Sequence, residues 1–188
     1  MWDYHEFMGE VLISEEDLQA RIKQLGAQIS EDYAQGNLLL VCILRGGVLF
    51  LTDLMRAINI PHAIEFMAVS SYGVGGRFSA GQVRINLDLN TDISQWDVIL
   101  VEDIIDSGHT LSHILDLLTI RTPRSLKVCA LLDKWERREV DIPVDYVGFK
   151  IPNKFVFGYG LDIDNYYRNL PFVGAVDLAK YQALLEKG

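Results

Sequence analysis

The chain has 188 residues, of which 49% are apolar, so it is long enough and hydrophobic enough to bury the core of one domain. Its 17 Lys and Arg against 26 Asp and Glu give a formal net charge of -9, which disfavours sequence-independent binding to nucleic acid, because phosphodiester backbones are also negative. The sequence does not open with a basic segment followed by an apolar stretch, and no apolar run reaches the about 18 residues of a membrane-spanning helix. We therefore expect a cytoplasmic protein with no nucleic-acid partner and no membrane partner.

The first part of the chain predicts a helix, a buried strand and a second helix. Ser14 is followed by three acidic residues, which is typical of a helix start, and apolar residues then recur at helical spacing as far as Gly36. The continuous apolar run at 38–44 indicates a strand buried on both faces. Arg45-Gly46-Gly47 separates this strand from a helix over 48–58.

The rest of the chain continues the alternation of strands and helices. The stretch from Ser70 to Gln82 is polar and contains four glycines, so we expect a mobile loop there. The other patterns predict strands at 62–69, 83–89, 97–101, 126–132, 145–149 and 155–157, and helices at 111–118 and 177–185. Such alternation predicts an α/β fold with a central, mainly parallel sheet flanked by helices, in a single domain over 1–188.

The stretch VILVEDIIDSGHTL, at 98–111, carries the clearest chemical signal. A hydrophobic strand ends in Glu102 and Asp103, and the loop DSGHT then opens a helix. The first amides of a helix have no intrahelical partner and carry partial positive charge, so they bind phosphate well. Gly108 allows close approach of the backbone, and Ser107 and Thr110 add hydroxyl donors.

Two other phosphate-binding motifs are absent from this stretch. The loop contains neither GxxxxGK[ST] nor GxGxxG. Two carboxylates would repel a polyphosphate tail, but they suit the diol of a ribose phosphate whose phosphate lies on the helix end. The plain alternative is a strand-to-helix turn with two solvated acids.

The same stretch resembles the phosphoribosyl-pyrophosphate (PRPP) motif of the type I phosphoribosyltransferases. Downstream, Lys134 after the strand LKVCALLD and the segment VGFKIPNKFVFGYGLDIDNYYRNLP resemble hypoxanthine-guanine phosphoribosyltransferases. The likeness runs from about Leu12 to near the C-terminus. It implies the type I phosphoribosyltransferase fold, with a core over about 15–150 and a small hood formed by the N-terminal segment and 150–188.

The resemblance also implies a PRPP site. Glu102 and Asp103 would bind the ribose hydroxyls directly or through Mg²⁺, with Asp162 helping to hold a second Mg²⁺. Asp106 would be the catalytic general acid/base, near N7 of the purine. The residues implied to bind PRPP are Glu102, Asp103, Asp106, Ser107, Gly108, His109, Thr110, Arg45, Gly46 and Arg168. Among these, Arg45-Gly46 matches a pyrophosphate loop in which a non-proline cis peptide is typical.

A purine site and a lid follow from the same resemblance. Lys134 would contact the exocyclic O6, Phe155 would stack on the base, and the backbone of Val156 would meet its Watson-Crick edge near Asp162. Ser71 and Tyr72 would belong to a lid that closes over the site. Each side chain also has a plain structural interpretation, as a charged turn, a core aromatic residue or a surface ion pair.

The implied reaction is purine salvage: PRPP and a 6-oxopurine, hypoxanthine or guanine, would give IMP or GMP and pyrophosphate. Lys134 favours a 6-oxo over a 6-amino group because an ammonium donates hydrogen bonds but accepts none. A xanthine-preferring enzyme and a PRPP-sensing regulatory protein remain alternatives. His109 replaces a lysine found in many family members, and Trp135 has no assigned role. The family forms dimers and tetramers, so we expect a homodimer or a homotetramer.

Overall fold

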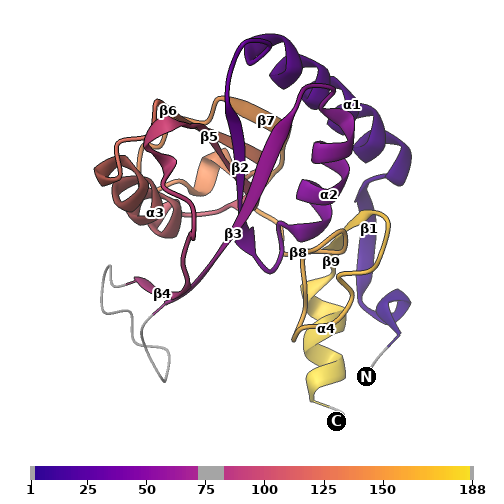
Figure 1. Cartoon of the computed structure of the whole chain (residues 1–188). Helices are drawn as coiled ribbons and strands as arrows, with labels where there is room; N and C mark the ends of the chain where they lie inside the picture. Colours follow the sequence, from indigo (N-terminus) through magenta and orange to yellow (C-terminus); the bar gives the residue numbers. More distant parts are fainter. Residues whose placement is uncertain (1–2, 72–82, 187–188) are drawn as a thin grey trace.

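The computed structural model describes residues 3–71 and 83–186, and its main sheet has six strands in the order β4-β3-β2-β5-β6-β7 (Figure 1). The strands are β2 (Leu38–Leu44), β3 (His62–Ser71), β4 (Val83–Leu87), β5 (Asp97–Ile105), β6 (Ser125–Asp133) and β7 (Tyr146–Lys150). All neighbouring pairs are parallel except β3 and β4, so the antiparallel strand lies at one edge. This arrangement confirms the predicted α/β fold.

Helices cover both faces of the main sheet (Figure 1). Helices α1 (Glu15–Asp32) and α2 (Val48–Ala57) pack on one face, and α3 (His109–Ile120) packs on the other. Successive residues of a strand point to opposite faces, so Leu40 of β2 joins the core under α1 and α2, whereas Val41 joins the core under α3. This two-sided burial explains the unbroken apolar run of β2.

Two element boundaries differ from the sequence prediction in the region of the phosphate-binding motif. Strand β5 continues to Ile105, so Glu102 and Asp103 lie inside the strand and not after it. The extension is held by backbone pairing with β6 up to Asp133, which hydropathy does not report. Helix α3 begins at His109 and not at Leu111, and Gly108 is its N-cap.

A second, three-stranded antiparallel sheet is built from both ends of the chain. We call this sheet, together with residues 155–186, the hood. Its order is β1 (Met8–Ile13), β9 (Val173–Val176) and β8 (Val156–Phe157), and α4 (Leu178–Leu185) follows it. Strands β1 and β9 were missing from the prediction, because each is short and is stabilised by a partner from the other end of the sequence. An aromatic cluster around Phe7 and Phe157 fills the hood.

The hood is joined to the main sheet through α1 and α2. The hydroxyl of Tyr159 donates to Asp53 Oδ2 at 2.5 Å, and Gln19 Nε2 donates to the same oxygen at 2.8 Å. The described residues also contain 3-10 turns at Tyr4–Glu6, Ile93–Gln95 and Trp135–Arg137, the last labelled η3. Over 3–71 and 83–186, no helix combines the length and the hydropathy that crossing a membrane requires.

Candidate active site

Glu102 and Asp103 form an acid pair within β5 at the carboxyl edge of the main sheet. Glu102 is 9% exposed, and burial together with the charge of Asp103 raises its pKa well above the usual range for a glutamic acid. Burial also raises the pKa of Asp103, although the Arg168 guanidinium opposes this shift. The Asp103 carboxylate accepts a hydrogen bond from the Ile104 amide at 2.8 Å. Such an acid pair is costly to ionise without a ligand or a cation beside it.

The Arg45-Gly46 loop, which follows β2, lies against this acid pair. A Cβ atom on Gly46 would overlap the Asp103 carboxylate, and one on Gly160 would overlap the carbonyl oxygen of Gly46. The peptide bond between Leu44 and Arg45 is cis. The structure therefore brings the loop implied to bind pyrophosphate next to the acids implied to bind ribose.

The loop from Asp106 to Thr110 leads from β5 into the N-terminus of α3. Gly108 has a φ of 91°, and a Cβ there would lie 2.7 Å from Ile142 Cδ1, so both conformation and space favour glycine. The carbonyl oxygen of Ser107 accepts hydrogen bonds from the amides of Glu139 and Val140 at 2.9 and 3.3 Å. These bonds hold the loop through the Ser107 carbonyl oxygen, and the first amides of α3 remain available to bind an anion.

The side chain of His109 lies at the solvent-exposed side of this loop. Its Nε2 is 2.9 Å from Glu139 Oε2, and the two side chains are 60% and 63% exposed. Thr110 is exposed as well. His109 therefore points its side chain away from the helix end toward solvent and Glu139.

Asp106 faces two cations that follow β6. The Lys134 ammonium lies 3.1 Å from Asp106 Oδ2, and Arg137 Nε lies 3.0 Å from Oδ1. Lys134 is only 6% exposed, so its charge depends on this carboxylate for a partner. The predicted acid/base and the predicted purine ligand are therefore adjacent. Arg137 was not among the predicted residues, because nothing in the sequence distinguishes it from the other charged residues of its turn.

Asp162 and Arg168 form an ion pair where the segment after β8 approaches the Arg45-Gly46 loop. Arg168 Nη2 is 2.8 Å from Asp162 Oδ1, and Arg168 Nη1 donates to the Gly160 carbonyl oxygen at 2.6 Å. The amide of Asn165 donates to Asp162 Oδ2 at 2.7 Å, and Arg45 Nη1 lies 3.4 Å from Asn165 Oδ1. Asp162, Arg168 and Arg45 are thus connected through Asn165, so one predicted metal ligand and two predicted pyrophosphate ligands lie close together.

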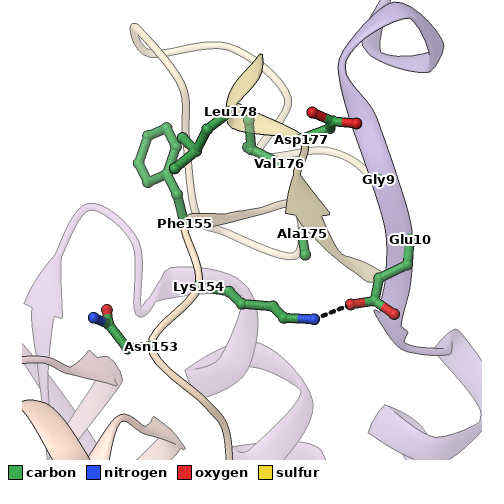
Figure 2. A pocket seen from close by; sticks show the side chains of 9 residues that line it. All are labelled: Gly9, Glu10, Asn153, Lys154, Phe155, Ala175, Val176, Asp177 and Leu178. Carbon is green, nitrogen blue, oxygen red and sulfur yellow. Dashed lines mark hydrogen bonds and ion pairs between the residues drawn. The ribbon is translucent and has the colours of Figure 1, made fainter. Parts of the chain in front are cut away.

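Phe155 and Val156 belong to the hood. The Phe155 side chain is 43% exposed, whereas Val156 is buried. Figure 2 shows Phe155 and Leu178 lining a pocket of the hood that Lys154, in an ion pair with Glu10, also lines. None of the other predicted site residues lines this pocket. Ser71 ends β3, and Tyr72 lies outside the described residues.

Comparison with known proteins defines the class. Residues 14–164 match the model of the phosphoribosyl transferase domain family, and the chain belongs to that family.

Several relatives are similar over nearly their whole length. The chain is 50% identical to the hypoxanthine phosphoribosyltransferase of Salmonella typhimurium, over 90% of this chain and 96% of that protein. It is 51% identical to the hypoxanthine-guanine phosphoribosyltransferase of Mycobacterium tuberculosis, over 92% and 88% of the two chains. The crystal structure of a hypoxanthine phosphoribosyltransferase from Staphylococcus aureus superposes with a TM-score of 0.90 at 46% identity, over 95% of this chain and 96% of that one.

Proposed function

We propose that this protein transfers the 5-phosphoribosyl group from PRPP to hypoxanthine, guanine or both, and releases IMP or GMP and pyrophosphate. The family membership and the similarity to hypoxanthine and hypoxanthine-guanine phosphoribosyltransferases support this function. The observation that carries it most directly is the 3.1 Å pair between Asp106 and Lys134 beside the phosphate loop, because it puts an acid/base and a hydrogen-bond donor for a purine in one place.

The arrangement suits a reaction in which charge separates. A purine nitrogen forms a bond to the ribose carbon as the bond to pyrophosphate breaks, and the leaving group takes the electron pair. The Glu102 and Asp103 carboxylates hold the ribose hydroxyls, and the amides at the start of α3 hold the 5′-phosphate. Asp106 accepts the proton that the base loses, a role that is typically worth about 10² to 10⁴ in rate.

The residues present also fit Mg²⁺. This cation prefers oxygen ligands and is usually held by one or two carboxylates together with substrate phosphates. Glu102, Asp103 and Asp162 would supply these carboxylates; no three acidic, His or Cys side chains gather at one point among the described residues, so the cation would take its other ligands from the substrate. The raised pKa values of Glu102 and Asp103 indicate that this acid pair gains from an added positive charge. When bound, the cation supplies positive charge that stabilises the leaving pyrophosphate. Arg168 is placed to add to that charge.

Lys134 carries the proposed preference for the base. A buried ammonium that must donate is satisfied by the 6-oxo group of hypoxanthine or guanine and is opposed by the 6-amino group of adenine. Xanthine differs from hypoxanthine at C2, so its use depends on the backbone near Val156 and on Asp162.

The decisive experiment is nucleotide formation by the purified protein with Mg²⁺, PRPP and each of hypoxanthine, guanine, xanthine and adenine. We expect turnover of hypoxanthine or guanine, and at least about 10³-fold lower kcat/KM for adenine. Faster use of adenine would contradict the role of Lys134. Fastest use of xanthine would support the xanthine-preferring alternative. Binding of PRPP without turnover of any base would support a regulatory protein.

A further inference from the structure

Arg137 lies on the same carboxylate as Lys134 because of the turn that joins them. Lys134 is the N-cap of η3, and Arg137 is its last residue. A 3-10 helix has three residues per turn, so side chains at positions i and i+3 project on one side. Lys134 therefore reaches Asp106 Oδ2 while Arg137 reaches Oδ1. Lys134 donates a hydrogen bond to Oδ2, whereas Arg137 pairs with Oδ1 through charge alone, because Oδ1 accepts no hydrogen bond from the described residues.

The backbone on both sides of this turn is attached to the loop that contains Asp106. The amide of Lys134 donates to the Ile105 carbonyl oxygen at 3.0 Å, and the amide of Glu139 donates to that of Ser107 at 2.9 Å. Asp106 lies between these two acceptors. These bonds hold the Asp106 main chain next to the turn, so the orientation of its carboxylate is left to the side chains that contact it.

A buried ion pair between Arg138 and Asp133 holds η3 against the end of β6. Arg138 Nη2 is 2.9 Å from Asp133 Oδ2, and Arg138 Nε donates to Asp133 Oδ1 at 3.0 Å. The Asp133 side chain is 3% exposed, so this bidentate contact is shielded from water. Arg138 Nη1 also donates to the Ile142 carbonyl oxygen at 3.0 Å. Arg138 therefore contacts Asp133 and Ile142, whereas Arg137 pairs with Asp106.

We propose that Arg137 is a positioning residue that keeps the Asp106 carboxylate in its reactive orientation while Lys134 donates to the base. This inference rests on the proposed function. The ammonium of Lys134 is shared between Asp106 and a bound 6-oxopurine, so its hold on Oδ2 weakens when the base binds. Among the described residues, Arg137 forms an ion pair with Asp106 alone. Its Nε lies 3.0 Å from Oδ1, an oxygen that is covered from solvent and accepts no hydrogen bond from the described residues, so the charge of Arg137 is what stabilises it.

Steady-state kinetics of Arg137→Gln with hypoxanthine and PRPP test the proposal. Loss of orientation at a reacting group costs up to about 10²-fold, so we expect kcat to fall about 10- to 100-fold while KM for PRPP changes less than about threefold. Arg137→Lys keeps a cation and is expected to recover most of kcat. Arg56→Gln, at the exposed last turn of α2, removes the same charge away from the site and is expected to behave as the unmodified protein.

A double substitution shows whether Arg137 acts through Asp106. If it does, Arg137→Gln lowers kcat in the unmodified protein but adds less than about twofold to the loss caused by Asp106→Asn. The proposal would be overturned if the kcat loss of the double variant equalled the product of the two single losses. It would also be overturned if Arg137→Gln were as active as Arg56→Gln. Should Arg137→Gln melt several degrees lower, Arg137→Lys decides: near-normal kcat supports the proposal, and an equal loss overturns it. Failure of the unmodified protein to form nucleotide would instead refute the proposed function.

Discussion

The backbone of Gly46 lies against the carboxylate of Asp103, with no room for a Cβ atom between them. The contact follows from the sheet, because β2 and β5 are parallel neighbours with Cys42 opposite Val101, and both chains leave the sheet at the same edge. The Gly46 carbonyl oxygen is in turn covered by Gly160, which belongs to the C-terminal part of the chain. Three segments far apart in the sequence thus form one surface.

Gly46→Ala should damage this surface. The added methyl group must displace Asp103 or the loop, and overpacking of this kind costs roughly 1–3 kcal/mol. We expect a lower melting temperature and at least about a tenfold loss of kcat/KM for PRPP. Gly9→Ala is the matched control, since the nearest atoms to a Cβ at Gly9 are at an ordinary 3.5 Å. If Gly46→Ala and Gly9→Ala had the same melting temperature and the same kcat/KM for PRPP, the contact between Gly46 and Asp103 would not contribute to stability or activity.

Glu102→Gln should stabilise the ligand-free protein at high pH. The folded protein raises the pKa of Glu102, so it holds this proton more tightly than the unfolded chain does. The contribution of Glu102 to stability therefore falls as pH rises from the unfolded value of about 4.3 through the raised folded value. Without Mg²⁺ and PRPP, we expect the free energy of unfolding of Glu102→Gln at pH 8 to be roughly 1–3 kcal/mol higher than that of the unmodified protein. We expect this difference to vanish near pH 4.

Denaturant unfolding at a series of pH values measures this difference. The exposed Glu31→Gln removes an equal charge and should show little change. A stability difference for Glu102→Gln that grows toward low pH would contradict the assignment. Adding Mg²⁺ and PRPP should stabilise the unmodified protein more than the variant, because only the former keeps the charged acid pair.

Asp106→Asn should separate chemistry from binding. The amide keeps the size of the carboxylate but cannot accept the proton that the base loses. We expect kcat for hypoxanthine to fall about 10²- to 10⁴-fold, while the Kd of PRPP, measured by calorimetry, changes only a few-fold. Equal losses in turnover and PRPP affinity would mean that Asp106 serves only in binding.

Tyr159→Phe should loosen the attachment of the hood. The Tyr159 hydroxyl donates to Asp53 Oδ2, and burial together with this hydrogen bond raises the pKa of Tyr159. Deleting the hydroxyl removes a hydrogen bond to a charged group, so we expect a loss of about 1–3 kcal/mol in the free energy of unfolding. Tyr166→Phe, at a side chain that is 52% exposed, is the control and should have almost no effect. Equal stabilities of the two variants would assign the attachment of the hood to other contacts.

The sequence by itself determined the features that depend on local pattern. The apolar run of β2 indicated a strand buried on both faces, and Ser14 followed by acids marked the start of α1, where its hydroxyl accepts from the Asp17 amide at 3.1 Å. The succession of strand, acid pair and DSGHT loop pointed to a ribose-phosphate site. These signals are readable because periodicity, helix capping and turn chemistry involve residues close together in the chain.

Only the tertiary structure decided where distant segments meet. It paired β1 with β9 from opposite ends of the chain, continued β5 through the acid pair, and set Gly46 against Asp103. It also placed Arg137 beside Asp106. In the sequence, Arg137 is one of several charged residues in a turn, and nothing there indicates this partner. Strand pairing and ion pairs between such segments depend on packing of the whole chain, and no local pattern encodes them.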